Sequence, residues 1–171
     1  MSVILQYASD YPITGGIGGF ESYLFIIAPK FIAEHGALDN SVVMVVDGKG
    51  SRYNYSMKDL STRKSALEFF DNAASVRGLD LSDEDCFSVV MMDFVSDDDK
   101  ELDFYDVQQP YDDLSNIFRR WCVDNDRLGV MAQHFSQKDR TPHVHIMYER
   151  KDKSLQSEFQ DYLDSLPLCS Y

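Results

Sequence analysis

Cysteine and long apolar runs are scarce in this sequence. The three cysteines, Cys86, Cys122 and Cys169, are scattered without CxxC spacing, so they predict neither a disulfide framework nor a zinc finger. No apolar run approaches the roughly 18 residues that a membrane-spanning helix needs. The first residues, MSVILQYASDYP, lack the basic start and long apolar core of a signal peptide. We therefore expect a reduced, cytoplasmic protein with no membrane segment.

Positive charge is also scarce. The chain has 16 Lys and Arg residues against 29 Asp and Glu residues, which gives a net charge of −13. Proteins that hold nucleic acid through its phosphates usually present a basic face, so any such face must be local. Two groups of basic residues are candidates for it: Lys138, Arg140, Arg150, Lys151 and Lys153, and Arg52, Lys58, Arg63 and Lys64.

The acidic balance also favours a different kind of partner. A strongly negative surface can compete with nucleic acid for the basic channel of a nucleic-acid-processing protein. A noncatalytic inhibitor or nucleic-acid mimic of phage or plasmid origin is therefore one hypothesis for this chain.

The residues that are present suffice for one folded core. The chain has 171 residues, of which 44% are hydrophobic and 13% aromatic, and this suits a single domain over 1–171. Short apolar runs predict strands at Ser2–Tyr7, Tyr23–Ile27, Ser41–Val46, Arg52–Tyr55, Cys86–Val95, Leu128–Phe135 and His143–Tyr148. Helical spacing predicts helices from Ser56 to Gly78, from Pro110 onward and over Ser154–Leu166.

Strands separated by helices, with a hairpin late in the chain, are typical of one fold class. They predict an α+β domain with an antiparallel or mixed central sheet and helices packed on one face of it.

Three of the four histidines lie close together in the predicted hairpin. His143 and His145 flank Val144 on one strand, so both rings share a face. His134, near the end of the preceding strand, lies nine positions before His143. Three imidazoles from adjacent strands form a ligand set for a divalent metal with positions left open for water or substrate. The other interpretation is that these histidines are solvated, or are buried and bonded to backbone carbonyls.

This segment resembles a known family. Asp139-Arg140-Thr141-Pro142-His143-Val144-His145, with His134 upstream, is similar to the HUH motif of single-strand DNA endonucleases. The similarity is greatest to Mob/Pre-type plasmid relaxases, and rolling-circle replication initiators carry the same kind of motif. The loop that follows His134 is longer than in the relaxase pattern, and the resemblance is confined to this segment.

The resemblance implies a fold, a chemistry and a set of residues. The fold would be a palm-like or RRM-like sheet with the histidine pair on a central strand. His134, His143 and His145 would bind Mn²⁺ or Mg²⁺, and Asp139 would join the metal ligands or orient a histidine. The substrate would be single-stranded DNA, whose scissile phosphate the metal polarises.

In this family the attacking nucleophile is usually a tyrosine. The chain has ten tyrosines. Tyr162 lies on the helix after the histidine strand, where replication initiators carry their tyrosine, but it also shares an apolar stripe with Phe159. Tyr53 and Tyr55, beside Arg52, are rivals. We take Tyr162 and Tyr53 as the candidates for the catalytic residue.

Three hypotheses follow for the function. The chain is a metal-dependent HUH-type nicking domain, or a noncatalytic acidic protein that binds a basic nucleic-acid-processing enzyme, or an unrelated α+β protein whose histidines coincide with the motif.

Overall fold

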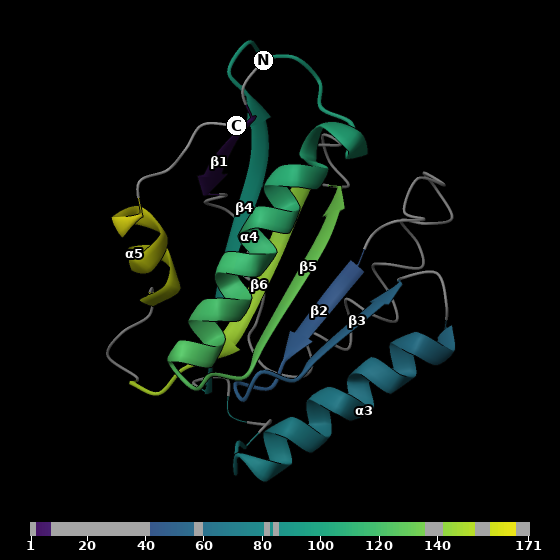
Figure 1. The fold of residues 1–171 in the computed structure, drawn as a ribbon, viewed down its shortest axis with the longest axis vertical. Helices are drawn as coiled ribbons and strands as arrows, with labels where there is room; N and C mark the ends of the chain where they lie inside the picture. Colours follow the sequence, from purple (N-terminus) through teal and green to yellow (C-terminus); the bar gives the residue numbers. More distant parts are fainter. Residues whose placement is uncertain are drawn as a thin grey trace.

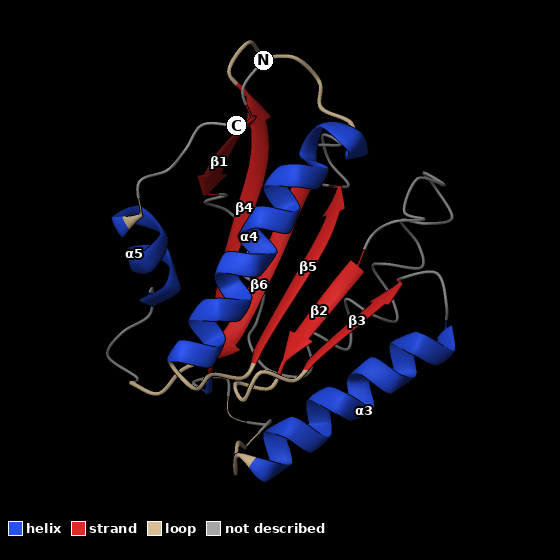
Figure 2. Cartoon of the chain, viewed as in Figure 1, coloured by secondary structure: helices blue, strands red, loops and turns tan. Residues whose placement is uncertain are grey.

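A computed structural model describes residues 3–7, 42–56, 60–80, 83, 86–135, 142–152 and 158–166. Within these ranges, six strands form one sheet with three helices packed on it (Figures 1 and 2). The strands are β1 (Val3–Tyr7), β2 (Val42–Val46), β3 (Arg52–Ser56), β4 (Phe87–Ser96), β5 (Gly129–Phe135) and β6 (Pro142–Glu149). The helices are α3 (Leu60–Val76), α4 (Phe104–Asp124) and α5 (Glu158–Ser165).

These elements confirm the predicted α+β class with a central sheet. The strand order is β1-β4-β6-β5-β2-β3, and every neighbouring pair is antiparallel. Strand β6, which carries both histidines of the pair, lies between β4 and β5 and is therefore internal to the sheet. The strand expected at Tyr23–Ile27 lies outside the described residues.

The helices cover both faces of the sheet, so the prediction of one covered face is wrong. Helices α4 and α5 pack on the face that carries Val144 and Ile146, with Phe118 and Phe159 in the same buried cluster. Helix α3 packs on the opposite face, where its Phe70 joins a separate buried cluster that includes Val43, Val45, Val130 and Met147. Burial of apolar area on both faces is the main stabilising contribution. A helix's apolar stripe does not reveal which face of a sheet it covers.

Helix α4 begins six residues before the position predicted from Pro110. The side chain of Asp103 accepts the N–H of Asp106 at 3.0 Å, and the side chain of Asp106 accepts the N–H of Asp103 at 3.0 Å. This reciprocal capping satisfies two otherwise unpaired donors and starts the helix at Phe104. Pro110 then lies inside the helix, where its ring removes one backbone donor.

Helix α3 ends where the sequence indicated, whereas the predicted start after Ser56 falls on residues 57–59, which lie outside the described residues. Ser56 is the last residue of β3, and the helix is described from Leu60. At the other end Gly78 has φ 67°, and its N–H donates to the carbonyl of Ser75 at 3.0 Å. This left-handed residue ends the helix in the usual glycine-dependent way.

A network of ion pairs joins separate segments of the chain where β6 ends. We call this end of the sheet the ion-pair end. Arg77, just after α3, donates to Glu149 of β6 at 2.7 Å and to Asp126 at 2.9 Å. The same Glu149 carboxylate accepts the N–H of Leu128 at 3.1 Å. Arg127 donates two bonds of 2.9 Å to Glu158 of α5. Ion pairs therefore join the end of α3 to β6, and join α5 to the segment that precedes β5.

Candidate functional site

The histidine pair lies on the face of β6 that is turned away from α4. Val144 and Ile146 are in the cluster beneath α4 and α5, so the alternate residues His143 and His145 belong to the face that α3 partly covers. Their ring centroids are 4.5 Å apart with an interplanar angle of 70°. The His143 side chain is 3% exposed. The predicted shared face is therefore confirmed, and the two rings are in edge contact.

Asp93 of β4 holds the ring of His143. The two residues are Cα partners in the β4–β6 ladder, and the Asp93 Oδ1 lies 2.6 Å from the His143 Nδ1. A bond this short is typical of a hydrogen bond to a charged acceptor. When Nδ1 donates its proton to a carboxylate, Nε2 of a neutral ring carries the free lone pair.

Sequence reasoning missed Asp93. The available signal was one aspartate within the apolar run CFSVVMMDFV of β4, because an ionisable residue in an internal strand usually has a partner. Assigning that partner required the pairing of β4 with β6, which the order of the strands along the chain does not reveal.

His134 lies directly opposite His143 in the β5–β6 ladder. Directly opposite residues in an antiparallel pair share a face, with Cβ atoms roughly 4.5–5.5 Å apart. Asp93, His143 and His134 thus form one line across β4, β6 and β5, which we call the histidine row. The side chain of His134 and the whole of Asp139 lie outside the described residues. Among the described side chains, no group of three or more His, Cys, Asp or Glu residues is arranged to hold a metal ion.

The structure does not bring Tyr162 to the histidines. Tyr162 packs against the buried cluster beneath α4 and α5, with its ring 6.3 Å from that of Phe159, and the sheet separates it from the face of His143. Tyr53 lies on the histidine face, where the centroid of its ring is 5.8 Å from that of Phe69 on α3. However, β3 is three strands from β6, or about 14 Å at ordinary strand spacing.

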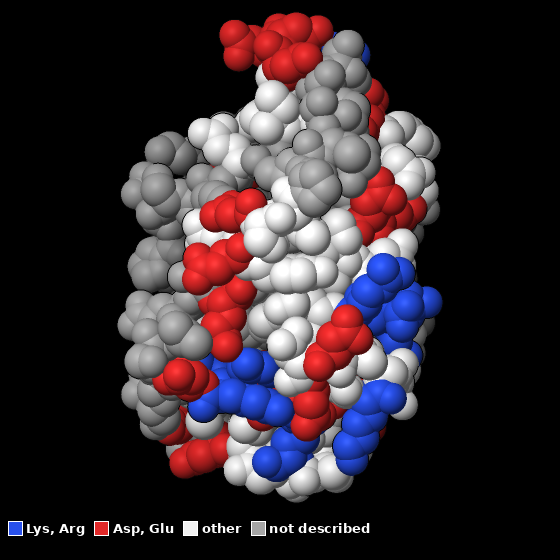
Figure 3. All heavy atoms as spheres, turned by 60° about the vertical axis from the view of Figure 1, so that its left-hand side comes forward, with Lys and Arg blue, Asp and Glu red and all other residues white. Residues whose placement is uncertain are grey.

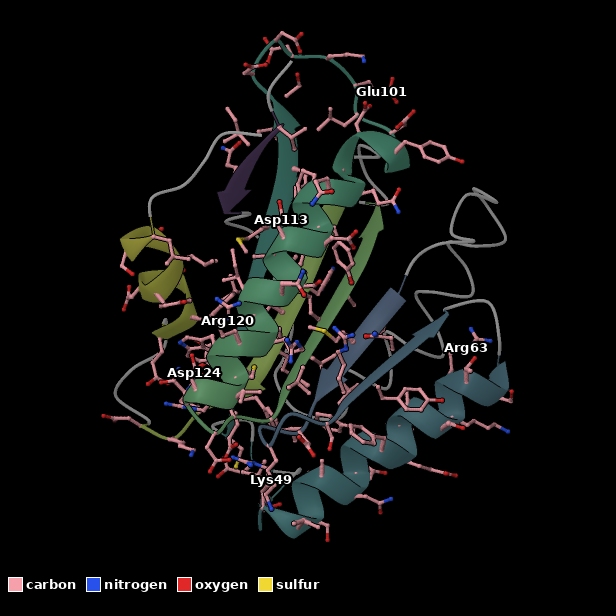
Figure 4. All side chains as sticks on the ribbon, in the orientation of Figure 1. Lys49, Arg63, Glu101, Asp113, Arg120 and Asp124 are labelled. Carbon is pink, nitrogen blue, oxygen red and sulfur yellow. The ribbon has the colours of Figure 1, made fainter. Side chains whose placement is uncertain are left out.

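Acidic side chains gather beyond the end of the sheet at which the histidine row lies, which we call the histidine end. The β4–α4 connection presents five exposed carboxylates there: Asp97, Asp98, Asp99, Glu101 and Asp103. Figure 3 shows this cluster at one end of the molecule, and Figure 4 places Glu101 beyond the sheet. The hydroxyl of Ser96 donates to Asp98 and lowers the pKa of that carboxyl. The histidine end is therefore strongly negative at neutral pH.

Basic residues do not surround the histidines within the described part of the chain. Arg150 and Lys151 follow β6 at the ion-pair end, about 23 Å along the strand from His143. There Arg150 donates to Ser88 at 2.9 Å, and Lys151 donates to Asp126 at 3.4 Å. The predicted basic face at the histidines therefore lacks these two residues, because the motif and the bases occupy opposite ends of one strand.

Of the other predicted bases, Arg52 on β3 and Lys64 on α3 are exposed. Arg63 is 7% exposed on α3, so it offers little surface for a ligand. Lys138, Arg140, Lys153 and Lys58 lie outside the described residues. None of the described helices is long and apolar enough to cross a membrane.

Comparisons of the chain with protein-family models, with curated proteins and with solved structures gave no match.

Proposed function

We propose that this chain is a metal-dependent domain of the HUH type that nicks single-stranded DNA, as relaxases and replication initiators do. One observation carries the proposal. His143 and His145 contact each other on an internal strand, with Asp93 bonded to His143 and with His134 opposite it. Of the three histidines in the motif, two have contacting rings and the third is the ladder partner of one of them.

Asp93 supports a metal-binding role for His143. Histidines that bind metals commonly donate their second ring nitrogen to a carboxylate, which fixes the ring and raises its basicity. With Nδ1 occupied by Asp93, Nε2 is the nitrogen of His143 that would bind the ion. His145 and His134 would complete a set of imidazole ligands. Asp93 would thus take the histidine-orienting role, which is one of the two roles that the resemblance implied for Asp139.

The donor set favours Mn²⁺ over Mg²⁺. Imidazole nitrogen suits transition metals, whereas Mg²⁺ prefers oxygen ligands and keeps its waters. A bound ion of this kind supplies a Lewis acid that polarises a phosphate oxygen. The exposed carboxylates at the histidine end attract cations to this side of the molecule.

The chain's own residues would hold the ion in a fixed position. His143 is almost fully buried, so its ring is held in one position by the sheet and by Asp93. Neither Tyr162 nor Tyr53 is beside it. The histidines would therefore bind the ion, and neither of these two tyrosines lies where it could attack a phosphate held there.

Thermal melting with added metal tests the metal site. Mn²⁺ should raise the melting temperature of the wild type, because a ligand that binds only the folded state stabilises it. The double variant His143→Ala/His145→Ala should show no rise. His35→Ala is the matched control, since His35 is the one histidine outside the motif. A wild type that melts identically with and without Mn²⁺ or Mg²⁺ would contradict the metal site.

Nicking is then assayed on a labelled mixture of single-stranded oligonucleotides. Mn²⁺-dependent cleavage by the wild type, lost in His143→Ala and retained in His35→Ala, is the expected result. Pure protein that binds Mn²⁺ but cleaves no oligonucleotide would reject the nicking activity and leave the metal site standing.

The exposed carboxylates at the histidine end favour a second candidate function, that of an acidic protein which occupies a basic nucleic-acid channel. Five carboxylates within a short connection resemble a run of phosphates in charge. This candidate predicts a complex with a basic nucleic-acid-processing protein that single-stranded DNA displaces. The triple variant Asp97→Asn/Asp98→Asn/Asp99→Asn should weaken that complex, and unchanged binding by the variant would exclude this surface.

A further inference from the structure

Solvent exposure falls steeply from β1 through β4 to β6, along the line in which the histidine row lies. Gln6 of β1 is the Cα partner of Asp93, which is the Cα partner of His143, so all three lie on one face of adjacent strands. Gln6 is exposed, the Asp93 side chain is 30% exposed and the His143 side chain is 3% exposed. Within the described part of the chain, the histidine row therefore meets solvent on its β1 side.

The exposed part of this face continues along β1. Ile4 is paired with Val95, lies on the same face as Gln6 and is 44% exposed. Strand β1 is the edge strand next to β4 and carries no charged residue. Among the residues that the structure describes, the first carboxylate that an anion crossing β1 meets on this face is Asp93. An approach from the end of the sheet would instead bring it past the five exposed carboxylates of the β4–α4 connection.

We propose that Gln6 is a substrate-binding residue and that single-stranded DNA reaches the histidine row across β1. This inference rests on the nicking function proposed above. Gln6 and His143 are two strands apart, about 10 Å at ordinary strand spacing. Gln6 therefore contacts a nucleotide beside the phosphate that lies at His143, not that phosphate itself.

Gln6 and Ile4, both exposed among the described side chains of β1, have the chemistry that a nucleotide needs. The Gln6 amide has two donors and an acceptor, which match the polar edge of a base or a backbone oxygen. Ile4 offers an aliphatic surface on which the apolar face of a base or sugar rests. Gln6 supplies contacts that bind and align the strand, whereas the histidines supply the site of the reaction.

Oligonucleotide binding by Gln6 variants tests the inference. The full chain is titrated into a fluorescein-labelled mixed-sequence single-stranded oligonucleotide with Mn²⁺ present, and anisotropy gives Kd. Gln6→Ala should raise Kd by about threefold to tenfold, as expected for one lost hydrogen bond. Gln6→Lys should bind at least as tightly as the wild type and depend more steeply on salt, because a lysine adds a phosphate contact.

Asn54→Ala is the matched control, because Asn54 is an exposed amide on β3, the opposite edge strand. Its Kd should equal that of the wild type, and all three variants should keep the Mn²⁺-induced rise in melting temperature. Wild-type affinity in Gln6→Ala would overturn the inference and leave the nicking function intact. Equal weakening in Gln6→Ala and Gln6→Lys would also overturn it and indicate a structural role. A wild type that binds Mn²⁺ but no oligonucleotide would reject both proposals together.

Discussion

The two ends of the sheet use charged residues in opposite ways. At the ion-pair end, Arg77 and Arg127 are matched with Glu149 and Glu158. At the histidine end, Asp93 is bonded to His143, and the connection beyond it presents five exposed carboxylates. Removing one partner of a buried ion pair is strongly destabilising, because it leaves an uncompensated buried charge. A carboxylate that orients one nitrogen of an imidazole leaves the other nitrogen for a ligand. We infer that stability is concentrated at the first end and function at the second.

The largest expected effect comes from removing the charge of Glu149. Its side chain is 9% exposed, as is that of Arg77, and its carboxylate also accepts the N–H of Leu128. Glu149→Gln should lower the free energy of unfolding by about 3 kcal/mol, as is typical when one partner of a buried ion pair is lost. Urea denaturation measures this change. A loss below about 1 kcal/mol, the range of exposed pairs, would show that the ion-pair end does not carry the stability.

The matching change at the histidine end should act mainly on metal binding. Asp93→Asn keeps the shape of the side chain but weakens its bond to His143, so Mn²⁺ affinity should fall by about tenfold to a hundredfold. Calorimetric titration of the full chain with Mn²⁺ gives this value. Glu149→Gln, measured below its unfolding temperature, is the control and should bind Mn²⁺ as the wild type does. Equal affinity in Asp93→Asn and the wild type would remove the distinction between the ends.

A substitution at Gly129 tests the packing of β5 against α4 near the ion-pair end, and it alters no charge. A Cβ added at this first residue of β5 would lie 2.6 Å from the Cys122 Sγ and 2.7 Å from the Phe118 Cζ. Both neighbours are buried in the core beneath α4. Gly129→Ala should therefore destabilise the fold by about 1–3 kcal/mol, as measured by urea denaturation. Gly50→Ala is the control for backbone strain. Its added Cβ would meet nothing within 4 Å, but its φ is 102°, so a comparison of the two variants separates backbone strain from overpacking.

The smallest expected effect concerns acid stability. The hydrogen bond from Arg77 lowers the pKa of Asp126. A lowered pKa in the folded state contributes stability above the unfolded value of about 3.9, and this contribution is lost as pH falls through the folded pKa. Asp126→Asn should therefore have little effect on the fall in melting temperature between pH 7 and pH 5. It should make that fall shallower below pH 4, and identical curves for the variant and the wild type would contradict the linkage.

Local patterns predicted most strands because neighbouring residues decide them. Alternation around Val144 placed both histidines on one face, and the rings indeed contact each other. The Asp47-Gly48 turn between β2 and β3 depends on adjacent residues in the same way: the Asp47 side chain accepts the N–H of Lys49 at 2.8 Å, and Gly48 has φ 84°. Such features need only a few consecutive residues.

Predictions failed where distant segments had to be combined. The start of α4 differs from the prediction because Pro110 suits the first turn of a helix, whereas the caps Asp103 and Asp106 stand earlier, within an acidic run. Arg150 and Lys151 were grouped with the histidines because they are near in sequence, although an extended strand carries them to the other end. Asp93 was overlooked because its partner His143 is 50 residues away.

The sequence by itself determined three features: which of the described segments form strands, the common face of His143 and His145, and the excess of negative charge. Each of them depends on side-chain periodicity or on composition. Only the tertiary structure decided that β4 and β5 flank β6, and hence that Asp93 and His134 stand on either side of His143. Strand order depends on how apolar faces are buried against helices from distant parts of the chain. That is a property of the whole packed core, and no short stretch of residues contains it.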